Sequence, residues 1–149
     1  MKYWRINTDS EGEENPRTCD LWYKFCMAFT GDYAENEGKH SIIFKKLEVG
    51  DGIFMHHTGL GIVGYGEVAK AWDGEFYKGN DKLLYKDEGR KELCEYRILV
   101  DWKGGYDSRE NPLPIRGRLP YRGTYSHIDS KWDVSSILQD LKNRNLHRQ

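Results

Sequence analysis

The stretch that decides the fold is Val49-Gly-Asp-Gly-Ile-Phe-Met-His-His-Thr-Gly-Leu-Gly-Ile-Val-Gly-Tyr-Gly-Glu-Val-Ala69. Two runs rich in β-branched and aromatic residues, 53–57 and 62–69, are joined by the short glycine-bearing link Thr58-Gly-Leu-Gly61. Such a link is typical of a β-hairpin. Within the second run, Gly64 and Gly66 lie on the same face, because alternate residues of a strand point the same way. The sequence therefore predicts that a helix or a ligand approaches the backbone closely there.

Further elements on both sides of the hairpin follow from composition and periodicity. Residues 2–7 and 96–102 are rich in strand-forming residues and predict two more strands. Apolar residues at helical spacing predict helices from about 18 to 29, over 41–47 and over 134–141, the last of them after the capping pattern Ser130-Lys-Trp-Asp133. We therefore expect an α+β protein. Its length of 149 residues suits one domain spanning residues 1–149.

The composition excludes several classes of protein. Hydrophobic residues make up 38% of the chain and charged residues 32%, with a net charge of −1, whereas disordered chains combine low hydrophobicity with high net charge. No apolar run approaches the ~20 residues of a membrane span, and the strand-like start with acidic residues after it argues against a secretory signal. The cysteines show no CxxC spacing and are odd in number: Cys19, Cys26 and Cys94. We therefore expect a cytoplasmic location, with neither a disulfide framework nor a membrane partner.

Charge is distributed unevenly along the chain. Residues 1–102 hold 14 Lys and Arg against 19 Asp and Glu, a net of −5, whereas residues 103–149 hold 9 against 5, a net of +4. Arginine exceeds lysine in this last third, and its planar group suits bidentate contacts with phosphate. The pattern fits either a polyanion-binding face or an ordinary solvated basic surface. The basic residues of this last third include Arg109, Arg116, Arg118, Arg122, Lys131, Lys142, Arg144 and Arg148.

Patterns for catalysis and metal binding are weak. The chain has no G-x-S-x-G nucleophile motif and no phosphate loop of the G-x-x-x-x-G-K type. His56 and His57 are neighbours on a predicted strand, so their side chains point to opposite faces and do not chelate one ion. We expect no metal, no cofactor and no catalytic residue. One enzymatic alternative stays open: Asp101 and Lys103, with Asp51 or Glu67, as a magnesium-dependent nuclease.

Aromatic residues form 13% of the chain, more than a core of this size needs. Flat side chains can build a slot for an unstacked base, but aromatic residues also favour strands in general. The aromatic side chains in or beside predicted loops and helix ends are Trp22, Phe29, Trp72, Tyr77, Tyr125 and Trp132.

Four segments, taken in order, resemble the PUA-like superfamily, most nearly its EVE and YTH domains. These segments are Tyr3-Trp-Arg-Ile-Asn-Thr-Asp9, Leu47-Glu-Val-Gly-Asp-Gly-Ile-Phe-Met-His-His57, Gly61-Ile-Val-Gly-Tyr-Gly-Glu-Val68 and Tyr96-Arg-Ile-Leu-Val-Asp-Trp102. The resemblance implies a small curved β-barrel with flanking helices and no catalytic activity of its own. It also implies recognition of a modified base, because YTH domains bind N6-methyladenine in RNA through an aromatic cage and EVE domains are thought to read modified bases.

The resemblance also implies a set of site residues. Trp22 fits one wall of the cage and Trp72 is expected as the opposite wall. The polar stretch after the first strand is Asn7, Thr8 and Asp9, and the second polar group is His57 and Thr58; Phe29 and Tyr125 complete the expected base-binding residues. Arg116, Arg118 and Arg122 are expected to bind phosphates.

Two departures from the family pattern bear on the ligand. Asn7-Thr8 stands where EVE sequences carry a lysine-serine pair, and residues 32–37 are acidic where an arginine-rich helix is usual. Neither the base nor the choice of DNA or RNA follows from the sequence. The sequence thus predicts a non-catalytic module that captures a modified or flipped base of DNA or RNA and works beside an associated nuclease or other effector protein. A nucleoside-binding or protein-interaction module is the alternative.

Overall fold

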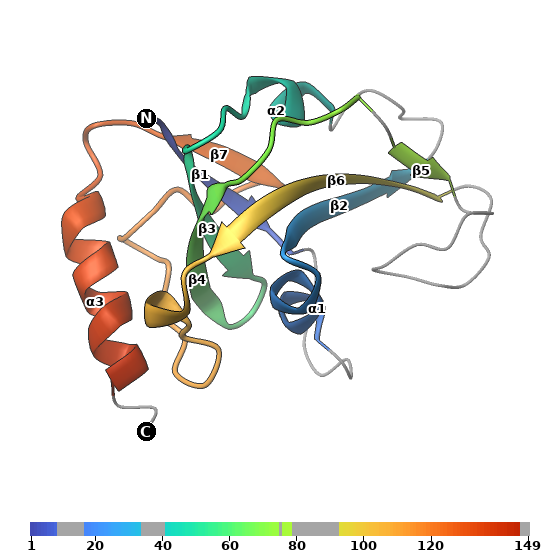
Figure 1. Ribbon diagram of the computed structural model, residues 1–149. Helices are drawn as coiled ribbons and strands as arrows, with labels where there is room; N and C mark the ends of the chain where they lie inside the picture. Colours follow the sequence, from blue (N-terminus) through green and yellow to red (C-terminus); the bar gives the residue numbers. More distant parts are fainter. Residues whose placement is uncertain (9–16, 34–40, 75, 79–92, 147–149) are drawn as a thin grey trace.

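A strongly curled sheet of seven strands forms the centre of the molecule, and three α-helices pack around it (Figure 1). The computed structural model describes residues 1–8, 17–33, 41–74, 76–78 and 93–146. The strand order is β2-β6-β4-β3-β1-β7, and β5 pairs with β6. The strands are β1 (Tyr3–Asn7), β2 (Met27–Tyr33), β3 (Gly52–His57), β4 (Gly61–Val68), β5 (Phe76–Lys78), β6 (Leu93–Trp102) and β7 (Tyr125–Ile128).

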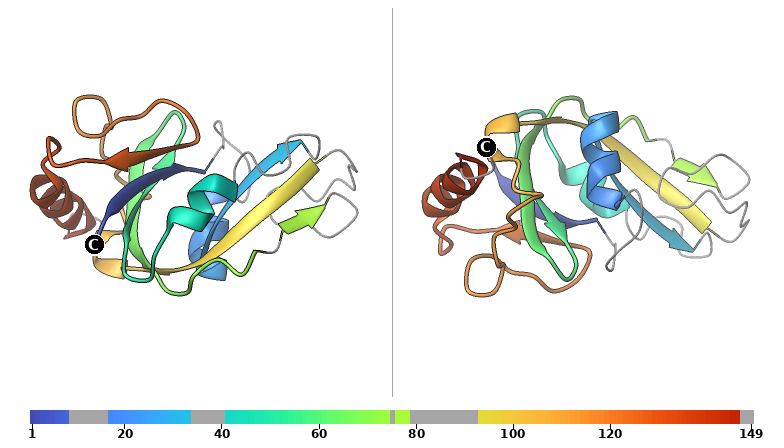
Figure 2. Two further views of the ribbon diagram at one scale, coloured as in Figure 1. Left: turned by 90° about the horizontal axis from the view of Figure 1, so that it is seen from above. Right: turned by 90° about the horizontal axis from the view of Figure 1, so that it is seen from below.

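The helices cover different parts of this sheet. They are α1 (Thr18–Phe25), α2 (Ser41–Lys46) and α3 (Val134–Leu146), with a short 3-10 turn, η2 (Gly104–Tyr106), before the last two elements of the chain. Figures 1 and 2 show α1 and α2 on opposite sides of β2 and β6, and α3 along the far side of the molecule next to η2. None of the described helices is long and apolar enough to cross a bilayer. The architecture is the expected α+β one, a small, strongly curved β-sheet with flanking helices.

The predicted hairpin is confirmed as β3 and β4, which pair antiparallel with one register shift between Met55 and His56. A helix approaches β4 closely at Gly64, on the face that carries the two glycines. The sequence predicts either a helix or a ligand there. The hydroxyl of Tyr23 on α1 donates to the carbonyl of Val63 at 2.8 Å. A Cβ built on Gly64 would stand 2.1 Å from that hydroxyl, so α1 reaches this position only because residue 64 has no side chain.

The turn before β3 is held by a buried carboxylate. Asp51, 2% exposed, accepts the backbone N–H of Lys2 (3.0 Å) and of Glu48 (3.1 Å), and the indole N–H of Trp4 (3.4 Å). These bonds join the turn to β1, which runs parallel to β3 with Trp4 opposite Ile53. The aspartate of the Val-Gly-Asp motif therefore connects the hairpin to the first strand by hydrogen bonds.

One predicted boundary is wrong. The first helix ends at Phe25, not at 29, because Cys26 takes the left-handed conformation (φ 52°, ψ 48°) and the chain then continues as β2. Strand β7 was also not predicted. In α3, the cap comes from Asp133, whose carboxylate accepts the backbone N–H of Ser136 at 3.0 Å.

The sheet separates two hydrophobic clusters. One contains Trp4, Ile6, Met55 and the aromatic side chains beside α1 and α2. The other contains Phe54 and Tyr65 and packs against α3. Because side chains alternate along a strand, residues Tyr3, Arg5 and Asn7 of β1 face the second cluster.

Candidate nucleic-acid interface

Polar side chains gather where the parallel strands β1 and β3 end. Asn7 lies opposite His56 in the register, and the backbone N–H of Thr8 donates to the carbonyl of His56 at 2.8 Å. The hydroxyl of Thr58 donates to the amide oxygen of Asn7 at 2.8 Å, and the hydroxyl of Thr8 lies 3.4 Å from Nδ1 of His57. We call Asn7, Thr8, His57 and Thr58 the β1–β3 polar cluster. Parallel strands bring residues 50 positions apart to one edge, which is how the cluster forms.

The cluster has a buried part and an accessible part. Thr8 and His57 are buried, at 3% and 0% exposure, whereas Asn7 and Thr58 are half-buried. An amide carries both donors and an acceptor, and a hydroxyl is both donor and acceptor. The accessible part therefore offers the mixture of groups that reads the edge of a nucleobase.

A buried arginine connects this cluster to the next segment. Arg5 is fully buried; its Nη1 lies 3.1 Å from Nδ1 of His56, and its Nη2 donates to the carbonyls of Arg122 (2.9 Å) and Gly123 (3.0 Å). Nη2 also reaches the hydroxyl of Ser126 at 2.9 Å. Burial lowers the pKa of Arg5 to about 10, which leaves it charged at neutral pH. We call residues 114–123 the arginine loop. Arg5 thus holds the end of this loop, residues 122 and 123, against β1.

His56 makes folding stability depend on pH. Burial above all, with the charge of Arg5 and then His57 adding, lowers the pKa of His56 from 6.5 to about 4. The unfolded chain binds this proton below pH 6.5 but the folded chain binds it only near pH 4. Stability is therefore complete above pH 6.5 and falls as the pH drops toward 4. We expect the contribution of His56 to fall by about 3 kcal/mol across this window, measured by urea denaturation at pH 7, 5.5 and 4.5.

The control for this dependence is His56→Gln, which keeps a polar side chain and removes the titration. Its stability should fall less steeply between pH 6.5 and 4.5 than that of the wild type. Equal slopes in the two proteins would show that His56 is not the group responsible.

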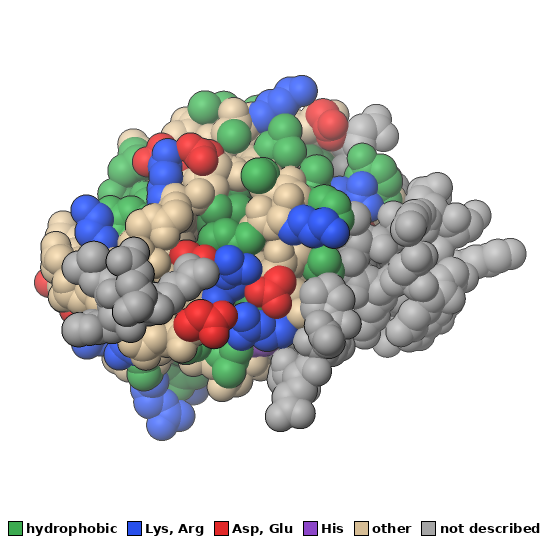
Figure 3. Space-filling model, turned by 60° about the horizontal axis from the view of Figure 1, so that its bottom comes forward, with side chains coloured by type: hydrophobic (Ala, Val, Ile, Leu, Met, Phe, Trp, Pro, Cys, Tyr) green, Lys and Arg blue, Asp and Glu red, His purple; other side chains and the backbone are tan. Residues whose placement is uncertain are grey.

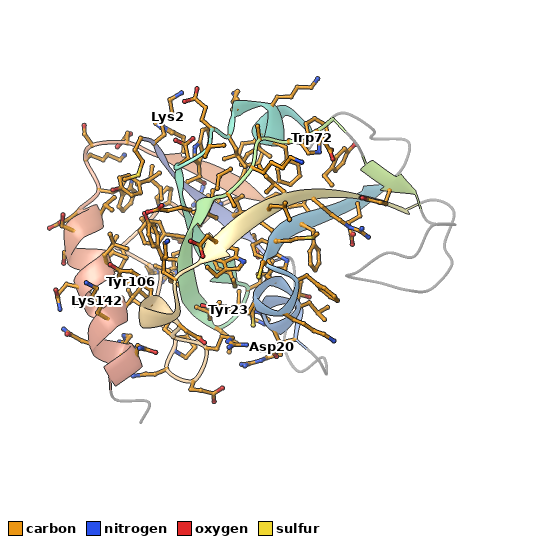
Figure 4. All side chains as sticks on the ribbon, in the orientation of Figure 1. Lys2, Asp20, Tyr23, Trp72, Tyr106 and Lys142 are labelled. Carbon is orange, nitrogen blue, oxygen red and sulfur yellow. The ribbon has the colours of Figure 1, made fainter. Side chains whose placement is uncertain are left out.

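The expected aromatic cage is not present as an open slot between Trp22 and Trp72. Trp22 is 0% exposed and stacks on Trp102 (5.9 Å between ring centres, 24° between planes), with Phe29 edge-on at 5.7 Å. Trp72 belongs to another aromatic group, 6.1 Å from both Phe44 and Tyr96. Figure 4 shows Trp72 beside α2 and the α1 residue Tyr23 on the opposite side of β6. The resemblance implies these two indoles as walls, but tertiary packing buries Trp22 in the core and leaves Trp72 half-buried against a different part of it.

The other predicted base-binding residues are spread over the structure. Phe29 is a core residue of β2, 1% exposed. Tyr125 of β7 is half-buried and lies opposite Ile6, one residue from the polar cluster. Asp9 lies outside the described residues. The indole N–H of Trp22 is buried and has no hydrogen-bond acceptor among the residues that the structure describes.

The predicted phosphate-binding arginines all lie in the arginine loop but differ in their surroundings. Arg116 and Arg122 are exposed, and neither forms an ion pair within the described part of the chain. Arg118 pairs with Asp140 of α3 at 2.7 Å and faces that helix instead of the polar cluster. Two of the three predicted arginines are therefore exposed without an ion pair to a described residue, and the backbone of one of them, Arg122, is bonded to Arg5 of β1.

The face below α1 is not uniformly basic. Arg109 pairs with Asp20 at 3.0 Å and with Asp107 at 2.7 Å, and Arg17 also pairs with Asp20 at 3.1 Å. Figure 3, which turns this side forward, shows blue and red side chains interleaved. These arginines hold α1 to the segment after η2, so phosphate contacts are better assigned to the arginine loop.

The nuclease alternative finds little support in the geometry. Asp101 and Lys103 form an exposed ion pair of 2.6 Å, and the carboxylate of Asp51 already accepts three N–H groups. No group of three metal-ligating side chains lies together within the described ranges. His56 and His57 face opposite sides, toward Arg5 and Thr8, as predicted.

Sequence reasoning did not single out Arg5 or His56 as parts of this region. A signal was present: Arg5 interrupts a strand of aromatic and apolar residues, Tyr3-Trp-Arg-Ile6. A charged side chain in such a run requires buried polar partners. Those partners lie more than 50 and more than 110 residues away, so the sequence did not name them.

Comparison with known proteins bears on the fold. No protein-family model matches the chain, and none of the curated proteins matches its sequence. Among solved structures, a hypothetical protein from Leishmania major is similar over 97% of this chain and 96% of its own, with 12% identity and a TM-score of 0.54. The two proteins therefore share a fold.

Two other similar structures hold nucleic acids. Human THYN1 protein in complex with 5-methylcytosine containing DNA is similar over 95% of this chain and 98% of its own (11% identity, TM-score 0.46). The YTH domain of Zygosaccharomyces rouxii MRB1 in complex with N6-methyladenosine RNA is similar over 95% and 86% (13% identity, TM-score 0.44). At these scores, neither structure assigns a ligand to this chain.

Proposed function

We propose that this chain is a non-catalytic nucleic-acid-binding module that captures a modified or flipped base at the β1–β3 polar cluster. The observation that carries the proposal is the half-buried Asn7–Thr58 pair, fixed at 2.8 Å, together with the hydrogen bond of 2.8 Å from the backbone N–H of Asn7 to the carbonyl of Thr124, which brings the end of the arginine loop, with its exposed Arg122, to this strand. The buried Arg5 holds these two parts together through His56 and the carbonyls of residues 122 and 123.

The arginine loop and the Asn7–Thr58 pair would have different roles in binding. Arg116 and Arg122 would contact phosphates, which position the strand but carry no sequence information. Asn7 and Thr58 would hydrogen-bond the edge of one base. A base must leave its stack to present that edge, so single-stranded or flipped nucleotides are the expected ligands.

The test compares oligonucleotides that differ in one methyl group. Single-stranded DNA and RNA with one 5-methylcytosine or N6-methyladenine are titrated against their unmodified counterparts, with binding followed by fluorescence anisotropy. The wild type should bind one modified strand more tightly than its control. Asn7→Ala with Thr58→Val should lose roughly tenfold or more of that affinity and most of the discrimination, because the base-edge contacts are worth about 1–3 kcal/mol.

Arg122→Ala is the matched control for the phosphate contacts. It should weaken modified and unmodified strands equally and lower the salt dependence of binding by about one ion. Equal binding of all strands by the wild type contradicts the proposal. Binding of a free nucleoside without salt-dependent binding of any strand would favour the small-ligand alternative instead.

A further inference from the structure

A cleft of about 410 Å³ lies at the other end of β1, between Tyr3 and the segment that leads into α3. Trp132 lines it, and a second cleft of about 300 Å³ lies next to Trp132, reaching Gly117 and Arg118 of the arginine loop. Lys131, Trp132 and Asp133 belong to both clefts. The half-buried indole therefore stands between two recesses, a position that the function proposed above does not use.

The first cleft has two aromatic walls. The ring of Tyr3 is fixed by Phe54 and Tyr65, at 6.3 and 6.4 Å between centres. The ring of Trp132 has the ammonium group of Lys131 above it, 5.4 Å from its centre. Aromatic side chains at an open cleft are platforms on which an unpaired base stacks, whatever its sequence.

The charges around the clefts favour one phosphate contact. Arg118 is neutralised by Asp140, and Asp133 is occupied as the cap of α3. Asp129 accepts the backbone N–H of Lys131 at 3.1 Å. The ammonium group of Lys131 forms no ion pair with any described residue, so it is the cation available to a ligand.

The cleft is connected to the β1–β3 polar cluster by the fold. Tyr3 and Asn7 lie on the same face of β1, four residues or about 13 Å apart. Strand β7 runs beside β1 and leads toward α3 (Figure 1), and Gly117 and Arg118 of the arginine loop line the second cleft. Arg5 lies between Tyr3 and Asn7 on this face and is buried, with its guanidinium bonded to the arginine loop, so a single strand bound at the cluster would reach Trp132 across the outer surface of that loop.

We propose that the Tyr3–Trp132 cleft binds a second nucleotide of the same strand, by stacking its base on Trp132 and placing its phosphate near Lys131. This inference rests on the function proposed above and adds a contact that is independent of base identity. It predicts that the module binds a short stretch of single strand, with the modified base at one end and a stacked nucleotide at the other.

The experiment measures binding of short single-stranded DNA and RNA oligonucleotides, with and without the modified base, to Trp132→Ala and Lys131→Glu. Each variant should weaken both kinds of strand alike, roughly 5- to 100-fold for Trp132→Ala, and leave their ratio unchanged. Phe25→Ala is the matched control, because Phe25 is an exposed aromatic residue with Lys24 5.4 Å above its ring but lines neither cleft. It should bind as the wild type does.

An abasic scan locates the contact. Single abasic sites are placed along the strand that carries the modified base; in the wild type one site away from that base should weaken binding, and in Trp132→Ala the same site should have no effect. Lys131→Glu, at an exposed position, keeps the test valid if Trp132→Ala folds poorly, as checked by circular dichroism. Wild-type affinity in both variants overturns this inference while leaving the discrimination at Asn7 and Thr58 intact. If the wild type binds modified and unmodified strands equally, while Trp132→Ala still weakens both, the proposed function is overturned instead.

Discussion

Trp22→Ala is expected to lower the free energy of unfolding by about 3–5 kcal/mol, the range for removing a large aromatic side chain from a packed core. Trp22 has no exposed surface and touches Phe29 of β2 and Trp102 of β6, so the substitution opens a cavity where α1 meets the sheet. Urea denaturation followed by circular dichroism measures the change. A loss of nucleic-acid binding in this variant would therefore be explained by unfolding, and would not show that Trp22 is a wall of a cage.

Trp22→Phe separates packing from recognition. It keeps an aromatic ring on Trp102 and removes an indole N–H that has no acceptor among the described residues. We expect this variant to lose only about 1–2 kcal/mol of stability and to remain folded. If Trp22→Ala were as stable as the wild type, the core position of this side chain would be wrong.

Asp51→Ala is expected to lower the free energy of unfolding by about 2–3 kcal/mol, because it leaves one buried and two partly buried N–H groups without this acceptor. The carboxylate of Asp51 accepts from Lys2, Trp4 and Glu48, and these bonds join β1 to the turn before β3. The same measurement applies, urea denaturation at neutral pH. The loss should come with weaker binding, since the polar cluster depends on the alignment of β1 with β3.

Asp101→Ala is the control for this prediction. Asp101 is an exposed aspartate that forms an ion pair with Lys103 at 2.6 Å, and surface ion pairs of this kind contribute up to about 1 kcal/mol. Its removal should change stability by no more than that. The same variant also tests the nuclease alternative, since a magnesium-dependent activity that disappears in Asp101→Ala would support it. A smaller effect for Asp51→Ala than for Asp101→Ala would contradict the role given to the turn.

The hairpin and the last helix were predictable because their signals are local. The glycine-bearing link between two β-rich runs leaves few alternatives to β3 and β4, and the apolar spacing after Asp133 matches α3. The boundary at Cys26 was not predictable in this way. Residues 22–29 have helical spacing, but pairing of β2 with β6 supplies backbone hydrogen bonds that only a distant strand can provide.

The same distinction, between local sequence signals and contacts with distant segments, applies to the candidate site. The family resemblance implies Asn7, Thr8, His57 and Thr58 as site residues, and parallel pairing of β1 with β3 brings them together. The arginines of residues 116–122 were selected by charge, but only the fold shows that Arg118 is bound to Asp140. Arg5, which fastens the loop to the cluster, gained its role from partners far away in the chain.

The amino-acid sequence by itself determined the alternation of strand and helix, the hairpin, and the polar character of the strand ends, since these depend on residues close together in the chain. Only the tertiary structure decided which aromatic side chains are buried and which line a cleft. Trp22 and Trp132 both stand in or next to helices, yet one is enclosed by β2 and β6 and the other borders open recesses. Burial is a property of what packs against a residue from elsewhere, and local sequence does not specify that.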